Sequence, residues 1–395
     1  MTTFATVAVV LALVAMVMIH EAGHYVTAKW SGMKVTEFFF GFGPRLWSTR
    51  RGETEYGVKA LPAGGYVRIL GMNSLEQVDA ADEPRTYRQA PFGRRLIVVS
   101  AGSVTHFLMA IALLWAMFAV VGTTDYARPQ PVVGQVETLT TGPSPAQLAG
   151  LRVGDRIVSV DGHRISSWSA IVPLIRDSPG RTVTIGVVRS GQDITLHATP
   201  VDLSTVKAPG VPVTTDHTGF LGVGPAYPTV RENPFGAVAT AVHQFGDTVA
   251  GTVTGLGHVF SPHGISSYAN QVAGRAAPTT ANGQSEAGSD RFVSVYGLVR
   301  LASEAAHSGL YDTLGLLVLI NVFVGVFNML PLLPLDGGHF VVAAYEWVRS
   351  RHGRRYRVDI RKLMPVTYAV LAVLFVVAST SIYLDIVRPL PNPFQ

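Results

Sequence analysis

This sequence predicts a helical membrane protein with four spans and one small α+β domain between the second and third spans. Apolar residues make up 48% of its 395 residues, and the mean hydropathy is +0.31. Charged residues make up only 14%, whereas a soluble domain carries about 25%. Four long apolar stretches account for most of this excess of apolar over charged residues.

Each of the four apolar stretches is long enough to cross a bilayer. A spanning helix needs about 20 mostly apolar residues, because lipid offers no hydrogen-bond partner to an open backbone. The stretches are 4–26, 96–121, 313–335 and 364–384. No Lys or Arg precedes the first stretch and no small-residue cleavage site follows it, so we expect a retained helix and not a signal peptide.

The basic residues of the loops predict an orientation. Residues 29–95 carry eleven Lys or Arg, and the much shorter segment 340–363 carries seven. Short loops rich in Lys and Arg stay in the cytoplasm. The 122–310 segment carries twelve, but long translocated segments are largely exempt from this rule. We therefore expect the two basic loops in the cytoplasm, and both termini and 122–310 outside.

Charge and cysteine content exclude several other classes of function. Lys and Arg number 31 against 26 Asp and Glu, which gives a net charge of +5. No long basic tract accompanies this small excess, so nucleic-acid binding is not expected. The sequence has no cysteine, which excludes disulfides, thiolate metal sites and cysteine nucleophiles.

The external segment contains the pattern of one compact domain. Short strands are expected at 132–136, 156–160, 183–189 and 194–199, with a helix at 169–176. The turn signals Asp161-Gly162 and Ser190-Gly191 separate the strands.

Residues 131–202 resemble a PDZ domain of the circularly permuted bacterial type. The resemblance rests on Ser-Pro-Ala-Gln-Leu-Ala-Gly-Leu at 144–151, on Gly154-Asp155-Arg156-Ile157-Val158 and on Val160-Asp161-Gly162. PDZ domains bind an extended peptide by strand addition, or a C-terminal carboxylate through backbone amides. The resemblance therefore implies a peptide ligand, and the alternative is a rigid spacer with an empty groove.

Three further segments connect this domain to the third span. Residues 203–230 have the composition of a linker. From Phe235 to Phe260, apolar side chains recur every three or four residues, which predicts an amphipathic helix along the bilayer surface or against the other domains. Residues 261–290 are rich in Gly, Ser, Ala and Asn and are expected to form a mobile connection.

The inner end of the first span carries a metal-binding pattern, His20-Glu21-Ala22-Gly23-His24. Residues four apart share one face of a helix, so both imidazoles can bind one Zn²⁺ ion, and Glu21 can act on a metal-bound water as a general base. Ionisable residues inside a membrane helix are costly and are usually functional. Residues that merely emerge into the cytoplasmic interface are the alternative.

The third span offers the remaining protein ligand. A catalytic zinc ion takes three protein ligands and keeps one position open. Asp336 follows an apolar stretch in which Pro331 and Pro334 interrupt the helix. Such a break, which is tolerated where protein or a water-filled cavity surrounds it, would direct Asp336 back toward the two histidines.

These two motifs together resemble those of the site-two proteases, zinc metalloproteases that cut peptide bonds within membranes. The chain is most similar to the bacterial regulators of anti-sigma-factor cleavage in their actinobacterial branch, almost from end to end. The family's His-Glu-x-x-His matches His20, Glu21 and His24, and its Asn-x-x-Pro-x-x-x-Leu-Asp-Gly matches residues 328–337.

The resemblance implies a role for each matching residue. His20, His24 and Asp336 would bind zinc, and Glu21 would activate water. Asn328 would hold the substrate backbone or its oxyanion. His339 is expected to support the site and not to bind the metal, because a fourth protein ligand would close it.

Two elements of the 29–95 loop fit the same resemblance. Phe40-Gly41-Phe42-Gly43-Pro44 resembles the family's Gly-x-Gly loop. Residues 53–61 and 66–70 alternate as two strands around 62–65, which resembles the family's membrane-associated β-hairpin on the cytoplasmic side; a plain loop is the alternative. An edge strand there could pair with an extended substrate. The residues expected to contact substrate are Gly41, Gly43, Gly64, Gly65 and Tyr66.

The start of the second span departs from the family pattern. Where the family usually has Gly-Pro-x-x-Asn, this chain has Gly102-Ser103-Val104-Thr105-His106. A role carried over to this position is in doubt, and the histidine inside the span could bond a neighbouring helix or alter substrate handling.

The sequence thus predicts an intramembrane zinc endopeptidase of the bacterial plasma membrane. The resemblance implies single-span membrane substrates, namely anti-sigma factors already trimmed outside, or remnant signal peptides. The external domain would exclude substrates with bulky outer parts. The alternatives are a catalytically silent adaptor with a PDZ-like groove and a metal transporter, although a transporter would be expected to show internal repeats that this sequence lacks.

The predicted segments follow the chain in order. They are the first span with the zinc motif (1–28), the cytoplasmic loop (29–95), the second span (96–121), the PDZ-like domain (131–202), the linker and amphipathic helix (203–290), the third span with the Asp motif (291–339), the basic loop (340–363) and the fourth span (364–388).

Overall fold

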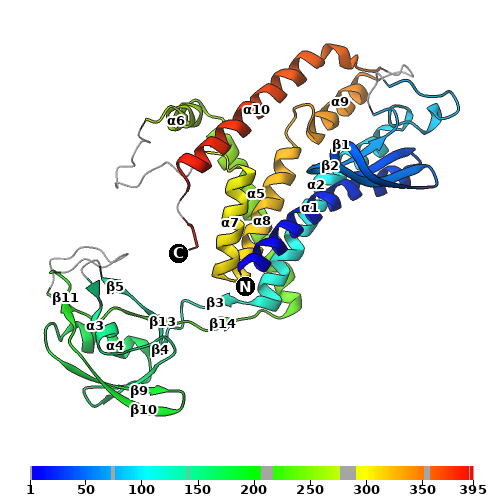
Figure 1. Ribbon diagram of the computed structural model, residues 1–395. Coiled ribbons are helices and arrows are strands. Elements are labelled where there is room, and N and C mark those ends of the chain that lie inside the picture. Colours follow the sequence, from blue (N-terminus) through cyan, green and yellow to red (C-terminus); the bar gives the residue numbers. More distant parts are fainter. Residues whose placement is uncertain are drawn as a thin grey trace. The chain divides into compact units, whose positions relative to one another are not determined.

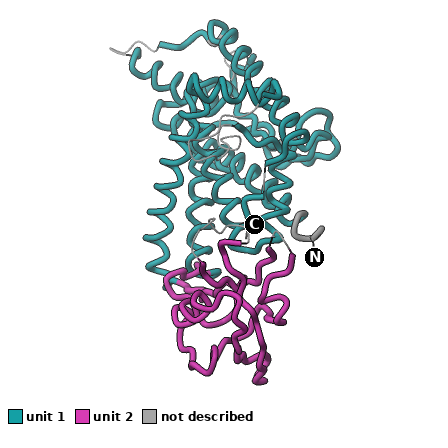
Figure 2. The backbone as a smooth tube through the Cα atoms, turned by 90° about the vertical axis from the view of Figure 1, so that its left-hand side faces the viewer, with its two compact units in different colours: residues 1–121, 232–395 teal, residues 122–231 magenta. Residues whose placement is uncertain are grey.

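The computed structural model describes residues 2–72, 76–139, 142–205, 217–275, 291–350, 356–390 and 392–394. The chain divides into two compact units, which Figure 2 shows in different colours. The helical unit comprises residues 1–121 and 232–395, and the strand-rich unit comprises residues 122–231.

Within the described residues, the helical unit has four helices that are long and apolar enough to cross a membrane. They are α1 (Thr2–Trp30), α2 (Phe92–Ala116), α8 (Leu310–Asn328) and α10 (Met364–Val387). α2 continues as a π-helical turn at Met117–Val121. These helices lie at the four predicted stretches and fit a membrane protein.

α8 is shorter than predicted, and the reason is local. It ends at Asn328 and not at 335, because Pro331 and Pro334 lack the amide that a helix needs and clash with the preceding turn. A new helix, α9 (Asp336–Arg349), begins after this break. It occupies part of the predicted basic loop, whose residues 351–355 lie outside the described residues.

The helices are held together around α2, which packs against both α1 and α8 (Figure 1). Ala110 and Leu114 of α2 share a buried cluster with Val318 and Val322 of α8. α10 packs against α6 (Pro262–Val272) and α7 (Val295–Ser308).

α5 (Pro234–Val259) is the predicted amphipathic helix, and it packs against α2 and α8. Its contact face includes part of the expected apolar stripe, since Phe245 and Val249 pack against the cluster shared with α2 and α8. Ala237 and Ala241 are fully buried in the shared cluster, whereas Val238 and Val242 are each 50% exposed. Small alanine side chains let two helix backbones approach closely, so Ala237 and Ala241 are buried in the contact while Val238 and Val242 stay half exposed.

The expectation of a mobile connection over 261–290 is wrong for its first part. α6 covers 262–272, and the side chain of Ser261 caps its first turn by accepting from the Gly264 amide. Residues 276–290 of the predicted connection lie outside the described residues.

The loop after α1 folds into one antiparallel sheet of β1 (Val35–Arg51) and β2 (Thr54–Ile69). Both halves of β2 pair with the same part of β1, since Phe39 lies opposite Gly57 on one side and opposite Tyr66 on the other. The predicted hairpin between 53–61 and 66–70 is therefore wrong, because 35–40 lies between those segments. Residues 65–69 form an edge of the described sheet.

In the part of the chain that the structure describes, the strand-rich unit contains one six-stranded sheet, three separate two-stranded pairs and short helices. Its strand order is β10 (Gln192–Ala198), β9 (Val183–Arg189), β7 (Arg156–Val160), β4 (Gln130–Val136) and β13 (Val223–Ala226). Four of these strands and α4 (Trp168–Arg176) lie where the sequence predicts them. Asp161-Gly162 and Ser190-Gly191 all have positive φ, as tight hairpin turns require.

The expected linker at 203–230 is wrong in its last part. β13 pairs with β4 and extends the sheet by one strand. Residues 206–216 of that segment lie outside the described residues.

Candidate metal centre

α1 brings the two histidines of the metal-binding pattern onto one face. His20 and His24 are one helical turn apart and are 9% and 6% exposed. The imidazole Nε2 atoms lie 3.3 Å from one another. The i and i+4 spacing therefore places both imidazoles on one face of α1, as the sequence predicts.

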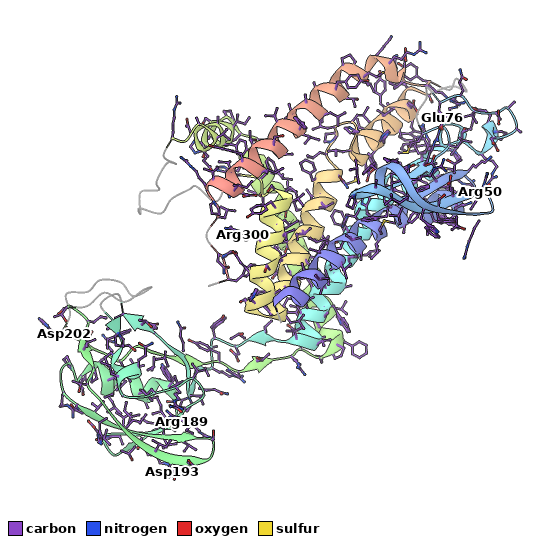
Figure 3. The ribbon with its side chains drawn as sticks, in the orientation of Figure 1. Arg50, Glu76, Arg189, Asp193, Asp202 and Arg300 are labelled. Atoms are coloured by element: carbon purple, nitrogen blue, oxygen red, sulfur yellow. The ribbon has the colours of Figure 1, made fainter. Side chains whose placement is uncertain are left out.

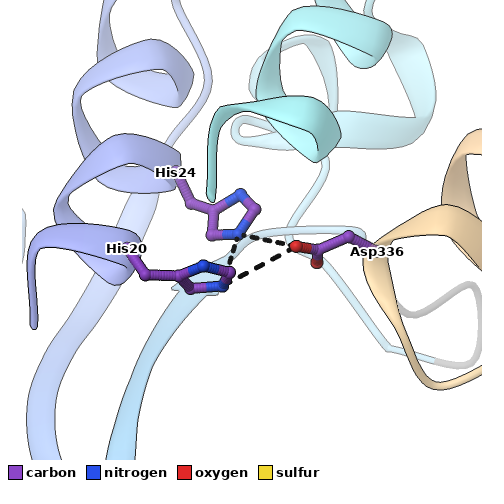
Figure 4. Close-up of side chains that lie close together, drawn as sticks. All are labelled: His20, His24 and Asp336. Atoms are coloured by element: carbon purple, nitrogen blue, oxygen red, sulfur yellow. Dashed lines mark hydrogen bonds and ion pairs between the residues drawn. The ribbon is translucent and has the colours of Figure 1, made fainter. Parts of the chain in front are cut away.

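Asp336 completes a compact triangle of ligand atoms (Figure 4). Its Oδ2 atom lies 3.3 Å from His24 Nε2 and 3.6 Å from His20 Nε2. Three ligands of a tetrahedral zinc ion, each about 2.0–2.1 Å from it, would stand about 3.3–3.4 Å apart. The described residues offer this buried Oδ2 no hydrogen-bond partner, which leaves it available to a cation. The donor set therefore fits Zn²⁺.

The break after α8 is what carries Asp336 to the histidines. Asp336 is the first residue of α9, directly after the turn 329–335. A Cβ atom on Gly337 would lie 2.2 Å from the Met329 carbonyl oxygen, and one on Gly338 would lie 2.5 Å from the Leu333 nitrogen. Only glycine fits at both positions, so the Leu-Asp-Gly-Gly sequence allows α9 to start tightly against the turn.

A backbone carbonyl fixes the orientation of the His24 ring. Its Nδ1 atom lies 2.7 Å from the carbonyl oxygen of Val98 on α2. A carbonyl only accepts, so Nδ1 carries the proton and Nε2 keeps the lone pair that a metal needs.

Gly102 is a functional position that the sequence reasoning missed. A Cβ atom there would lie 2.3 Å from His20 Cε1 and 2.4 Å from His24 Nε2. Both imidazoles therefore fit only because α2 has no side chain at this point. The signal was a glycine inside an apolar span, where it otherwise weakens the helix.

His106 and Asn321 form a second missed feature. His106 is buried, and its ring centroid lies 5.0 Å from that of His20. The His106 Nδ1 atom lies 2.9 Å from Asn321 Oδ1 on α8. Polar residues inside two apolar spans were the available signal, and the sequence identified only the histidine.

Glu21 lies beside the edge of the sheet. A Cβ atom on Gly65 would be 2.9 Å from Glu21 Cγ, so the glycine lets the strand approach the general-base position. The backbone of Val67 also lies next to the Glu21 carboxyl group. Residues 65–69 and Glu21 are thus brought together, as strand addition near the site requires.

The other residues expected to contact substrate have different surroundings. The Tyr66 ring stacks on Phe39 and Phe42, and its hydroxyl donates to the Glu37 carboxylate. Gly41 has a φ of +89°, and a Cβ atom there would meet the Leu61 carbonyl oxygen at 2.8 Å. Gly43 and Gly64 also have positive φ. These glycines shape the turn of the sheet.

Asn328 and His339 lie on either side of Asp336 in the sequence. Asn328 is the last residue of α8 and is half-buried. His339 is not part of the metal-binding group found among the described residues, and burial lowers the pKa of its imidazole. It lines a cavity of about 620 Å³, together with Val67 and Ile69 of the edge strand and Pro334.

Comparison with known proteins identifies the family of this chain. The model of Peptidase family M50 matches residues 8–376. Zinc metalloprotease Rip1 of Mycolicibacterium smegmatis is 33% identical, and the alignment covers 96% of each chain. Zinc metalloprotease Rip1 of Mycobacterium tuberculosis is 34% identical, again over 96% of each chain. These matches confirm the resemblance to the site-two proteases and their actinobacterial branch, and zinc as the cofactor: the chain belongs to peptidase family M50 and is a membrane zinc metalloprotease.

Proposed function

We propose that this protein is an intramembrane endopeptidase that hydrolyses peptide bonds within the membrane-spanning segments of single-span proteins. The observation that carries the proposal is the buried triangle of His20, His24 and Asp336, two of whose members lie on a candidate span. A protease with its metal ligands inside a span must receive its substrate at membrane depth.

The proposed zinc ligands are His20 Nε2, His24 Nε2 and Asp336 Oδ2. Bound there, zinc would polarise the scissile carbonyl group and lower the pKa of a water molecule. Glu21 takes a proton from the attacking water and passes it to the nitrogen of the departing segment. One water molecule is consumed for each peptide bond, and a new carboxylate and a new amine are released. Asn328 is proposed to hold the substrate backbone or its oxyanion.

The substrate is proposed to bind as an extended strand along 65–69. A helix hides its amides in its own hydrogen bonds, whereas hydrolysis needs an exposed peptide bond, so an unwound segment must be held open. An edge strand supplies free amides and carbonyls for this purpose. Glu21 lies beside the strand at Gly65. Val67 and Ile69 of the same strand line the 620 Å³ cavity. Gly41, Gly43 and Gly64 would shape this surface, and Tyr66 would brace it through Glu37.

The proposed orientation places the β1–β2 sheet in the cytoplasm of a bacterial cell, and both termini and residues 131–202 outside the plasma membrane. The loop charges support it. Substrates would be anti-sigma factors already trimmed outside, or remnant signal peptides.

We propose that residues 131–202 act as a PDZ-like filter that excludes substrates with large outer domains. A bound peptide could instead fill the groove of this domain. Deletion of 131–202 should allow an untrimmed substrate to be cut, and unchanged selectivity after the deletion would exclude the filter.

The proposed hydrolysis is tested by Glu21→Gln. The full-length protein is purified in detergent, its zinc content is measured, and it is incubated with a panel of single-span proteins. Loss of the general base should lower the cleavage rate by roughly 10²- to 10⁴-fold, with zinc retained. Glu55→Gln, which changes a partly exposed carboxylate on the same sheet, is the matched control and should cleave normally.

The same experiment distinguishes the two other classes of function. A silent adaptor or a metal transporter would work equally well with Gln at position 21. Cleavage that persists at the wild-type rate in Glu21→Gln would overturn the proposal.

A further inference from the structure

Two buried polar side chains, His106 of α2 and Asn321 of α8, face each other directly behind the candidate metal centre. His106 is 2% exposed and Asn321 is fully buried. Their side chains meet at 2.9 Å, from His106 Nδ1 to Asn321 Oδ1. Burying a polar side chain inside a membrane span costs free energy, and such residues usually have a function. The proposed hydrolysis uses neither His106 nor Asn321.

The hydrogen bonds around Asn321 fix which nitrogen of His106 carries a proton. The Asn321 Nδ2 atom donates to the Leu317 carbonyl oxygen at 2.8 Å. Because that carbonyl only accepts, the amide oxygen must face His106. His106 Nδ1 must then donate, and the neutral ring keeps an acceptor lone pair on Nε2.

His20 needs such an acceptor. Its ring lies against that of His106, with centroids 5.0 Å apart and planes 44° apart. If His20 Nε2 binds a metal, Nδ1 must carry the proton. This Nδ1 atom is buried, and no hydrogen-bond partner for it occurs in the described part of the chain. Histidines that bind metals usually donate this second N–H to a fixed acceptor.

We propose that His106 is a positioning residue whose Nε2 accepts a hydrogen bond from His20 Nδ1–H when a metal is bound. In the structure the two rings are neighbours, but this hydrogen bond is not formed. A continuous series of hydrogen bonds would then lead away from the metal: His20 donates to His106, His106 to Asn321, and Asn321 to the Leu317 carbonyl oxygen. It fixes the ring orientation of His20, as Val98 does for His24. This inference rests on the proposed zinc site. It gives a role to the residue at which the sequence departs from the family pattern.

The Gly102 backbone is the competing partner, because it also lies close to the His20 ring. If its carbonyl were the acceptor for Nδ1–H, removing the His106 lone pair would leave zinc binding unchanged. The two assignments therefore make opposite predictions for one substitution.

The test measures zinc and not catalysis. Full-length wild type and His106→Leu are purified in detergent and loaded with one equivalent of zinc, and zinc release to a chromophoric chelator is followed. The variant should bind zinc about 10- to 100-fold more weakly, the usual loss when a supporting hydrogen bond is removed. Asn321→Leu should weaken zinc binding in the same way, because it frees the His106 ring to adopt the other tautomer.

Two further variants separate the hydrogen bond from packing. His106→Gln places an amide oxygen near the Nε2 position and should restore most of the affinity. His307→Leu removes an exposed imidazole on α7 and should leave zinc release unchanged. Thermal unfolding of the metal-free proteins shows whether a variant has failed to fold.

The outcomes also separate this inference from the proposed function. A wild-type protein that binds no zinc would overturn the site itself. A wild type that binds zinc, together with His106→Leu that releases it at the same rate, would overturn only the role of His106. Equal losses in His106→Leu and His106→Gln would show that packing matters and the acceptor does not.

Discussion

The absence of a side chain at Gly102 allows the imidazoles of His20 and His24 to pack against α2. A Cβ atom added to Gly102 would lie 2.3 Å from His20 Cε1 and 2.4 Å from His24 Nε2, and both distances are far below normal contact. His20 and His24 cannot move away without leaving the face that points to Asp336. Position 102 therefore accepts only glycine as long as both histidines keep these positions.

We therefore predict that Gly102→Ala disrupts the metal centre. The added methyl group should displace His20 or His24, lower the zinc content of the purified protein and reduce cleavage on the order of 100-fold, since misplacement by about 1 Å has that effect. Metal analysis and cleavage assays measure both quantities.

Gly93→Ala is the matched control for this prediction. Gly93 lies on the same helix, and no described atom comes within 4 Å of its Cβ position. Alanine there should leave the protein unchanged or slightly more stable, because glycine weakens a helix by about 0.5–1 kcal/mol. Full zinc binding in Gly102→Ala would contradict the steric argument.

Among the helices, α10 is fixed by polar contacts near its C-terminal end. Asp385 accepts from Arg291 Nη2 at 2.7 Å and from the Ser294 backbone amide at 2.7 Å. Both charged side chains are almost completely buried, at 2% and 3% exposure. Tyr268 of α6 adds a hydrogen bond to Thr380 at 2.7 Å. These contacts anchor α10 to α6 and α7.

Asp385→Leu should therefore detach α10. The substitution leaves the Arg291 guanidinium buried without its carboxylate partner, and loss of one member of such a pair costs about 3–5 kcal/mol. Thermal unfolding in detergent and protease sensitivity of α10 measure the change.

The double variant Asp385→Leu/Arg291→Leu separates charge from packing. It removes both charges and should recover much of the lost stability. If the double variant is as unstable as the single one, the buried charge is not the cause.

On the scale of the whole molecule, the proposed orientation follows from loop charge, and the sequence makes it simple to test. The chain contains no cysteine, so a single introduced thiol reports its own accessibility. Arg50 lies at the tip of the β1–β2 sheet and Asp193 lies on β10 of the strand-rich unit (Figure 3), and both are exposed.

We predict that a membrane-impermeant maleimide labels Asp193→Cys on intact cells and labels Arg50→Cys only after lysis. The reason is that short loops rich in Lys and Arg remain in the cytoplasm, while a long segment is exported regardless of its charge. Labelling of Arg50→Cys on intact cells would reverse the orientation.

Sequence periodicity was sufficient to predict where individual strands begin and end, but not which strands pair with one another. β7 and β9 begin and end where alternation predicts, because strand patterns depend on neighbouring residues. The pairing of both halves of β2 with 35–40 could not be read in this way, since alternation defines the faces of a strand and not the strand beside it. The alanine face of α5 was missed for a related reason, because the fit between two helices decides which face is buried.

The sequence by itself determined the four apolar helices, the class of enzyme and the identity of the candidate ligands, because hydropathy and short motifs are local properties of the chain. Only the tertiary structure decided that Asp336 lies within 3.6 Å of both histidines, that Gly102 clears the space for them, and that Asn321 and His106 stand behind His20. These contacts join residues from α1, α2, α8 and α9. No local pattern specifies which side chains of separate helices will meet, since the packing of the whole helical unit sets those distances.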